Sequence, residues 1–302
     1  GRGRASGAPR VVAGTATSRG EAEYAVGGAR LDGATSFRPG SRFGPERIRR
    51  FARPFDDYDR ASGLHFSDLA VHDHGDVRAW DDAPEYLQWL AGELRDVVAD
   101  AAVPVVLGGE HTVSAAGVNA VDPEVFVCLD AHLDLRSEYD GNEYSQATVT
   151  RRILDRAGAG VADGRDGSAD EAGSGVEEAV VIGARTGSPA EWDRAEQSDV
   201  TVVAPEDVPG FDLDAHVNGR SAYLSVDVDA ADPGFAPGTG TPEPFGLAPR
   251  ELRDVVRAVA PSAAGFDVVE VNDRDDGQAA SLAAKLCRAF VYAHADSREQ
   301  SD

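Results

Sequence analysis

Three short segments of the sequence combine histidine with closely spaced carboxylates, the side chains that bind divalent metal ions. They are Glu110-His111, Asp130-Ala131-His132-Leu133-Asp134 and Asp227-Val228-Asp229. Carboxylates packed this densely repel one another, and a multivalent cation converts the repulsion into ligation. Two histidines and four aspartates are enough for two metal ions that share bridging carboxylates. The spacing therefore predicts a two-metal site.

Each of these segments follows an apolar run, at residues 103–107, 125–129 and 222–226, and in the first case Gly108 and Gly109 lie between. Runs of this length and composition are typical of strands that are buried on both faces of a parallel sheet. The metal-type residues would then lie at the carboxyl ends of the strands. In open α/β sheets this is the edge where ligands bind.

The rest of the chain alternates between strand and helix patterns. Further strands are predicted at residues 24–28, 179–183, 200–203 and 266–271, and helices at 45–51, 82–100, 250–260 and 278–294. This alternation predicts one parallel sheet with helices on both faces.

We expect one domain, at residues 23–296, between a flexible leader at 1–22 and a short tail at 297–302. Residues 158–175 are rich in Gly, Ala, Asp and Ser and read as a surface insert. Residues 232–249 hold several prolines and glycines directly after the second aspartate cluster. Long ordered loops of this kind are usually functional.

The charge of the chain limits its partners and its environment. The net charge is −24 with a pI near 4.5, which argues against binding to nucleic acids or anionic membranes. Lys285 is the sole lysine among 302 residues. Abundant acidic residues with few lysines are typical of proteins that work in concentrated salt, so we expect a halophilic cytoplasmic protein. An acidic mesophilic protein is the alternative, but it does not explain the missing lysines.

Other features of the sequence predict little chemistry. Cys128 and Cys287 lie in apolar patterns and read as core thiols, which fits a reducing compartment. His72 and His74 form a His-x-His pair in what reads as a polar surface loop. No apolar stretch is long enough to span a membrane or to form a signal core. Methionine is absent, so we expect that a native start precedes residue 1.

The motifs resemble those of a known family. Gly-Gly-Glu-His-Thr at 108–112, Asp-Ala-His-Leu-Asp at 130–134 and Ser-Val-Asp-Val-Asp-Ala-Ala-Asp-Pro at 225–233 resemble the three signature motifs of the ureohydrolases, the arginase and agmatinase family. Further blocks at 39–45, 236–241 and 267–272 occur in the family's order. The resemblance covers nearly the whole chain, which looks most similar to prokaryotic-type agmatinases from extreme halophiles.

The resemblance implies a three-layer α/β/α fold with a mainly parallel sheet and a site for two Mn²⁺ ions. One ion would be held by His111, Asp130, Asp134 and Asp227. The other would be held by Asp130, His132, Asp227 and Asp229. Carboxylate and imidazole ligands suit Mn²⁺, although zinc also accepts them.

The same resemblance implies a chemistry. Two metal ions lower the pKa of a bridging water, and the resulting hydroxide attacks the guanidinium carbon of the substrate. Glu270 would orient the guanidinium, and Asp134 would pass a proton to the departing amine. The products would be urea and a primary amine.

Three positions bear on activity and substrate: Gln146 is a candidate catalytic residue, and Arg136 and Asn142 are candidate substrate-binding residues. Gln146, in the block that begins at Asn142, stands where the family usually has a histidine, and glutamine cannot titrate. Arg136 stands where arginases commonly place an asparagine for the α-carboxylate of arginine. That form resembles agmatinases, although an arginine near the mouth would repel the distal ammonium of agmatine.

Three interpretations therefore remain open. The first is an agmatinase, which yields putrescine and urea. The second is an amidinohydrolase for guanidinobutyrate, arginine or aminopropylagmatine. The third is a catalytically impaired metal-binding relative, because Gln146 replaces the histidine. By analogy with the family we expect a homo-oligomer, a trimer or a hexamer.

Overall fold

The apolar runs of the sequence form the strands of one parallel sheet. The computed structural model describes residues 17–80, 82–158 and 175–300. Within them, eight strands pair in the order β2-β1-β3-β8-β7-β4-β5-β6, and every pairing is parallel. The strands are β1 (Tyr24–Ala29), β2 (Val71–Val77), β3 (Val103–Gly108), β4 (Val125–Leu129), β5 (Glu178–Ile182), β6 (Val200–Val203), β7 (Ala222–Asp227) and β8 (Ala263–Val269).

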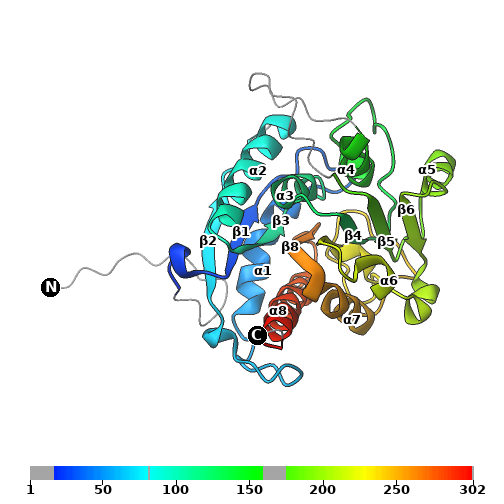
Figure 1. Cartoon of the computed structure of the whole chain (residues 1–302). Helices are drawn as coiled ribbons and strands as arrows, with labels where there is room; N and C mark the ends of the chain where they lie inside the picture. The colour runs from blue at the N-terminus through cyan, green and yellow to red at the C-terminus, as the bar shows by residue number, and fades with distance from the viewer. Residues whose placement is uncertain (1–16, 81, 159–174, 301–302) are drawn as a thin grey trace.

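Helices cover both faces of this sheet (Figure 1). One face packs against α1 (Gly44–Ala52), α7 (Pro249–Val259) and α8 (Gln278–Glu299). The other packs against α2 (Ala83–Ala99), α3 (Val113–Val121) and α4 (Val149–Gly158). The shorter helices α5 (Pro189–Ala195) and α6 (Asp214–Val217) lie near the β6 edge. The predicted α/β class with helices on both sides is confirmed.

The side chains of each strand alternate between the two faces of the sheet and so build one hydrophobic core on each face. In β4, Val125, Val127 and Leu129 join the core beneath α7 and α8, whereas Phe126 and Cys128 join the core beneath α3 and α4. Successive side chains of a strand point to opposite faces, so an uninterrupted apolar run fills both. This explains why the strands of the sequence are apolar throughout rather than alternating.

The strand order brings the three predicted metal motifs together. Strands β3, β8, β7 and β4 are consecutive neighbours in the sheet. Because parallel strands end at the same edge, the residues that follow these four strands meet there. The segments concerned are 109–111, 270–272, 228–229 and 130–134.

Several local predictions need correction. His72 and His74 lie in the edge strand β2, not in a loop. Strand β8 ends at Val269, so Glu270 lies just beyond the strand rather than within it. Helix α8 continues to Glu299, beyond its predicted end. Helices α3, α4, α5 and α6 were not predicted; small residues weaken the apolar pattern of α3, and α5 and α6 are short. Most of the predicted insert and of the leader lies outside the described residues.

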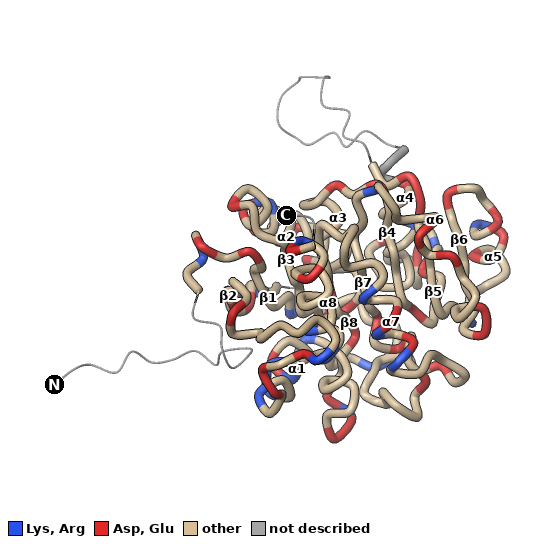
Figure 2. Tube along the Cα trace, turned by 60° about the horizontal axis from the view of Figure 1, so that its bottom comes forward, with Lys and Arg blue, Asp and Glu red and all other residues tan. Residues whose placement is uncertain are grey.

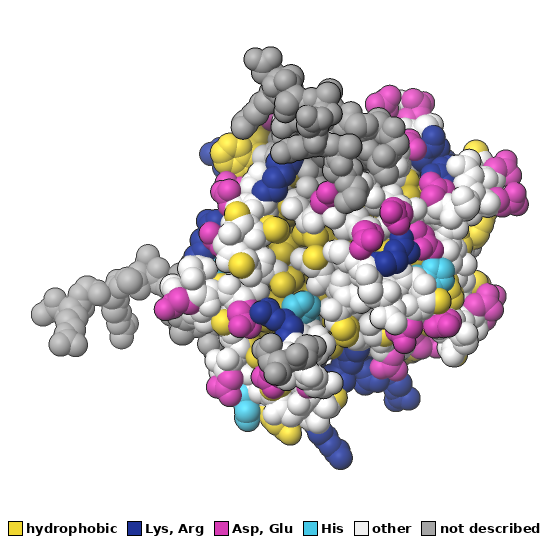
Figure 3. All heavy atoms as spheres, viewed as in Figure 1, with side chains coloured by type: hydrophobic (Ala, Val, Ile, Leu, Met, Phe, Trp, Pro, Cys, Tyr) yellow, Lys and Arg dark blue, Asp and Glu magenta, His cyan; other side chains and the backbone are white. Residues whose placement is uncertain are grey.

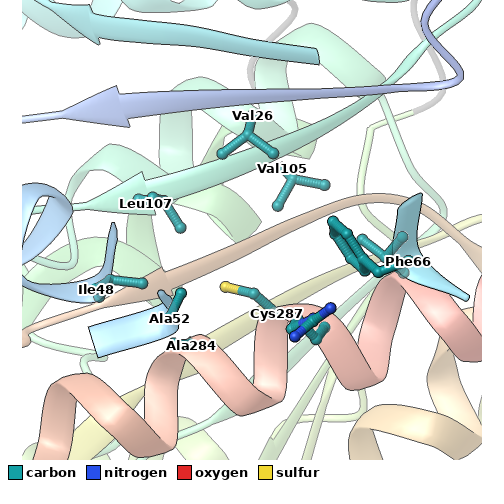
Figure 4. A pocket seen from close by; sticks show the side chains of 10 residues that line it. Val26, Ile48, Ala52, Phe66, Val105, Leu107, Ala284 and Cys287 are labelled. Atoms are coloured by element: carbon teal, nitrogen blue, oxygen red, sulfur yellow. The ribbon is translucent and has the colours of Figure 1, made fainter. Parts of the chain in front are cut away.

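Cys287 lies beside a small apolar cavity between α8 and the sheet. The cavity is about 20 Å³ and is lined mainly by aliphatic side chains, among them Val105, Leu107 and Ala284 (Figure 4). Burial raises the pKa of the Cys287 thiol far above its ordinary value. A space of this size holds at most about one water molecule, so we interpret it as imperfect packing rather than as a ligand site.

Acidic residues are distributed over the whole molecule rather than collected in one patch. Asp and Glu recur along the trace in loops and helix ends (Figure 2). On the face in Figure 3 they lie among neutral atoms and Arg groups. None of the described helices is long and apolar enough to cross a membrane.

Candidate metal centre

His111 lies at the centre of a group of buried carboxylates. Its Nδ1 atom is 3.0 Å from an oxygen of Asp130, 3.0 Å from one of Asp134 and 3.6 Å from one of Asp227. His111 itself is 1% exposed, and the three carboxylates are buried too. Four potential ligands from three strand ends therefore surround one point.

His132 forms a second group next to the first. Its Nδ1 atom is 3.4 Å from Asp130 and 3.1 Å from Asp229. The ligand atoms of these three residues all lie within 4.8 Å of one another. Asp130 uses its Oδ2 toward His111 and its Oδ1 toward His132, so it occupies a bridging position between the two groups. His132 is the most exposed member, at 27% of its side chain, and marks the side that opens to solvent.

Short backbone hydrogen bonds fix the orientation of these aspartates. Asp130 Oδ1 accepts from the N–H of His132 at 2.7 Å, and Asp227 Oδ1 accepts from the N–H of Asp229 at 2.8 Å. Asp229 Oδ1 accepts from the N–H of Ala131 at 3.1 Å, which ties the two clusters together. Each of these aspartates thus has one oxygen held by the backbone and its second oxygen turned toward a histidine.

The electrostatics of the cluster are those of carboxylates and histidines that are buried together. Burial raises the pKa of Asp134 to about 7, helped by the charge of Asp130. Burial and the charges of Asp229 and Asp130 raise the pKa of Asp227 well above its ordinary value. Burial alone would lower the pKa of His111, but its neighbours, Asp130 among them, raise it well above the usual range. Burial would likewise raise the pKa of Asp130, but His111 and His132 hold it below its ordinary value. The histidines thus compensate this carboxylate, while Asp134 and Asp227 remain penalised as anions.

A metal pair fits these residues. His111 Nδ1 is buried and makes no hydrogen bond within residues 17–80, 82–158 and 175–300, although carboxylate oxygens lie 3.0 Å away. A nitrogen lone pair that faces converging carboxylates is the arrangement of a metal ligand. The set of carboxylate oxygens and imidazole nitrogens matches the preference of Mn²⁺ and its neighbours among divalent ions.

Glu270 lies beside the cluster with one oxygen engaged and one free. Its Oε1 accepts from the backbone N–H of His111 at 2.9 Å. Its Oε2 is buried and has no hydrogen-bond partner in the described chain. Burial, reinforced by Glu110, raises the pKa of Glu270 well above its ordinary value. A buried carboxylate oxygen of this kind requires a cationic or N–H donor partner.

Gln146 is buried at the start of the segment that leads into α4. Its amide Nε2 is 3.0 Å from Ser36 Oγ, and its Oε1 is buried without a partner among the described residues. The loop that carries Ser36 also donates the Ala34 N–H to Glu110, next to His111. The next residue after Gln146 accepts a hydrogen bond from the N–H of Arg136, two residues after Asp134.

The two other residues expected to contact substrate lie further out. Arg136 is partly exposed, pairs with Glu191 at 3.1 Å and lies over the ring of Tyr139. Asn142 is exposed, and its side chain accepts from the N–H of Tyr144 within its own loop. The structure brings neither of them into contact with the carboxylate cluster.

Comparison with known proteins places this site in a family. The model of the arginase family matches residues 22–292. The chain belongs to the arginase family. An agmatinase of Pyrococcus horikoshii is 33% identical over 276 residues, which cover 88% of this chain and 90% of the relative. An N(1)-aminopropylagmatine ureohydrolase of Thermococcus kodakarensis is 33% identical and covers 88% of each chain.

A solved structure shows the same fold. The agmatine ureohydrolase of Thermoplasma volcanium superimposes with a TM-score of 0.83 at 31% identity, over 96% of each chain. This arginase-family protein is therefore a hydrolase of the ureohydrolase class, whose members depend on two metal ions.

The structure of this arginase-family protein also reveals polar residues that the sequence did not single out. Arg185 donates from its guanidinium to the backbone carbonyls of Asp229 at 2.8 Å, Glu243 at 2.6 Å and Pro244 at 3.0 Å. It thus fixes the second aspartate cluster to the proline-rich loop that follows. Its sole signal in the sequence is a charged residue directly after an apolar strand.

Asp267 is the second residue that sequence reasoning did not assign. It is fully buried in β8 and accepts hydrogen bonds from Tyr223 and Ser225. Burial raises its pKa above the ordinary value. A carboxylate within an apolar strand is a signal that was present in the sequence, since such a group needs buried partners.

Proposed function

We propose that this protein hydrolyses agmatine to putrescine and urea. The observation that carries the proposal is the buried Oε2 of Glu270, which has no hydrogen-bond partner among the described residues, while Oε1 accepts the backbone N–H of His111 in the metal cluster. A guanidinium group offers planar N–H donors with a positive charge, which is the chemistry that such an oxygen recognises. Two of the most similar relatives bear names of agmatine-type ureohydrolases, which supports the same substrate class.

In this proposal the metal ligands are those of the two groups described above. His111, Asp130, Asp134 and Asp227 would hold one Mn²⁺ ion, and Asp130, His132, Asp227 and Asp229 would hold the other. When bound, the two ions would supply a hydroxide nucleophile near neutral pH. Glu270 would orient the guanidinium, and the hydrogen bond that it accepts from the backbone N–H of His111 would keep substrate and metal ligands in register. Asp134 would take up the proton that the nucleophile loses and pass it to the departing amine.

The surroundings of Arg136 support a dicationic substrate. An isolated arginine near the mouth would repel the distal ammonium of agmatine. The contact with Glu191 at 3.1 Å offsets that charge, and Glu191 is itself buried. The ion pair therefore removes the argument against agmatine that the sequence alone raised. Aminopropylagmatine, which carries a longer cationic tail, is the second candidate because one relative is named for it.

Gln146 is compatible with turnover in this scheme. General acid–base help from one side chain is typically worth about 10²–10⁴-fold, so its absence slows a reaction without abolishing it. The buried Oε1 of Gln146 gives the site an acceptor for a substrate N–H. We propose that Gln146 binds the substrate and moves no proton. The pH dependence of the reaction should then show no ionisation from this position.

The test measures urea release by the Mn²⁺-loaded protein in buffered molar KCl. Agmatine, aminopropylagmatine, guanidinobutyrate and arginine are compared at equal concentrations. Agmatine should give the highest kcat/KM. Greater kcat/KM with any of the other three would replace the proposed substrate. Absence of urea from all four, with two manganese ions bound per chain, would favour the non-catalytic interpretation.

Gln146→His serves as the companion variant. A gain of at least tenfold in kcat would identify an enzyme impaired at this position. An unchanged or lower kcat, in an active wild-type protein, supports the binding role of Gln146. The same assay with His132→Asn, which removes a proposed metal ligand, provides the inactive control.

A further inference from the structure

The side of His111 that faces away from the carboxylate cluster contacts a buried polar network. His111 Nε2 is 3.2 Å from Ser225 Oγ, and both residues are buried. Ser225 lies in β7, two residues before Asp227, so the strand that supplies a proposed metal ligand also contacts the back of the imidazole.

Asp267 holds Ser225 from the neighbouring strand. Ser225 Oγ donates to Asp267 Oδ1 at 2.7 Å, and the hydroxyl of Tyr223 donates to Asp267 Oδ2 at 2.9 Å. Ser225 and Asp267 are register partners in the pairing of β7 with β8. The register of the sheet therefore sets this contact, and the carboxylate has no freedom to turn toward the metal cluster.

Counting protons gives the direction of the hydrogen bonds around Ser225, whose Oγ is closer to His111 Nε2 than Cys128 Sγ at 3.5 Å. A serine hydroxyl has one proton to donate and two lone pairs. Ser225 gives its proton to Asp267, which is an acceptor. Its two lone pairs then receive the Nε2–H of His111 and the hydroxyl of Ser114, which lies 3.1 Å away. All three capacities of Ser225 are thereby used.

This assignment determines the tautomer of His111. In the neutral imidazole that a metal ion binds, the proton is then on Nε2 and the lone pair is on Nδ1, which is the atom 3.0 Å from Asp130 and 3.0 Å from Asp134. We propose that Asp267, acting through Ser225, is a positioning residue that presents His111 Nδ1 to the metal ion on the His111 side. The inference rests on the metal site of the proposed function, and it adds residues that lie outside the ligand set.

The second metal group lacks an equivalent support. His132 uses Nδ1 toward Asp130 and Asp229, and no hydrogen bond from its Nε2 occurs among the residues described. Partners that orient a metal-binding histidine typically change metal affinity by about 10–100-fold. The effect of Asp267 should therefore fall on one of the two ions, with the other as an internal reference.

The experiment compares Mn²⁺ binding by the wild type, Ser225→Ala, Asp267→Asn and the double variant. Binding of the two ions is resolved by calorimetric titration against a chelator, and the spin-coupled metal pair is followed by electron paramagnetic resonance. Each single variant should weaken one site about 10–100-fold and leave the other within threefold. The double variant should be no weaker than Ser225→Ala, because Asp267 acts through Ser225.

Ser114→Ala is the matched control, since it removes a hydroxyl of the same network that contacts Ser225 and Asp267 rather than the His111 ring, and it leaves the bond between Ser225 and Asp267 in place. It should change neither site by more than about threefold. Tyr223→Phe leaves the bond between Ser225 and Asp267 in place and should behave likewise.

Three results would overturn the inference. One is unchanged binding in both single variants, and another is equal weakening of both sites. The third is additive losses in the double variant, which would indicate separate structural damage. A wild-type protein that binds no metal pair is a different result, because it would overturn the proposed function itself. Ser225→Ala keeps the test decisive if Asp267→Asn does not fold.

Discussion

Replacement of Glu270 by glutamine tests the central contact of the proposed site. The change keeps the shape of the side chain and an oxygen that can accept the backbone N–H of His111, a hydrogen bond of 2.9 Å. It replaces the free Oε2 with an NH₂ group and removes the negative charge. Two N–H donors, one on the protein and one on the guanidinium, would then face each other.

The size of the effect follows from burial. Glu270 is 1% exposed, so water does not screen its contact with a cation. Removing one partner of a buried, hydrogen-bonded charge pair costs about 2–5 kcal/mol. Each 1.36 kcal/mol is tenfold in rate, so Glu270→Gln should lower kcat/KM for agmatine by about 30–5,000-fold. Because the contact is proposed for both the bound substrate and the transition state, KM should rise as well.

The stability of the metal-free protein should change little. Burial raises the pKa of Glu270 well above its ordinary value, so the metal-free site disfavours the charged form of this carboxyl relative to its neutral form. Glutamine resembles that neutral form in shape and charge. The midpoint of thermal unfolding should stay within about 3 °C of the wild type, since the expected change is below about 1 kcal/mol. A large fall in that midpoint would show that the variant reports on folding instead.

Glu110→Gln is the matched control for this prediction. Glu110 is equally buried and lies next to His111, but Ala34 donates to its Oε2 at 2.7 Å and Thr112 donates to its Oε1 at 2.6 Å. Both of its oxygens are thus occupied by the protein. The kcat/KM of the Glu110→Gln variant for agmatine should fall less than tenfold, with two manganese ions still bound per chain. Equal losses in the two variants, or a loss below fivefold in Glu270→Gln, would refute the assigned role.

Three further predictions concern the supports of the site. Arg185→Lys should weaken metal binding by the Asp229 group and lower the midpoint of thermal unfolding by several degrees. The reason is that an ammonium group cannot reach the carbonyls of residues 229, 243 and 244 together. Thermal scans with and without Mn²⁺ measure both effects. The metal-free protein should lose stability as pH rises from about 4 through 7. In the folded protein Asp134 and Glu110 have pKa values of about 7, so they keep protons that the unfolded chain releases. Urea unfolding at pH 5 and pH 8 should therefore show a smaller free energy of unfolding at pH 8. Stabilisation by added Mn²⁺ should be larger at pH 8 than at pH 6, since the ligands must lose protons to bind it, and equal shifts at the two values would contradict this.

Much of the site could be predicted because its ligands follow buried strands. Each of these ligands is a polar residue that interrupts an apolar pattern at the end of a strand. They are His111, Asp130, Asp134, Asp227 and Asp229. The same reasoning could not predict the order of the strands in the sheet. Nothing in the residues shows that β8 inserts between β3 and β7, yet this insertion brings Glu270 beside His111.

Backbone conformation is the other property that residue patterns do not reveal. Asp134 has φ of +52° and Glu270 has φ of +61°, values that non-glycine residues rarely adopt. Each such residue costs about 1–3 kcal/mol and persists only where its surroundings hold it. The Glu270 N–H donates to the carbonyl of Gly109, and the carbonyl of Asp134 accepts from Arg151. Long-range contacts therefore set both conformations.

The left-handed turn at Glu270 explains why this residue and Asp267 play different roles although they lie three residues apart. Asp267 keeps the regular β conformation, and its register with Ser225 directs it to the back of His111. Glu270 leaves the strand, and its turn directs the carboxylate to the front, where Oε1 accepts the His111 N–H. One strand thus holds the same histidine from both sides, through its ring and through its backbone. A change in how β8 pairs with β7 would move both contacts together, so metal affinity and guanidinium binding should decline in parallel in variants that disturb this pairing.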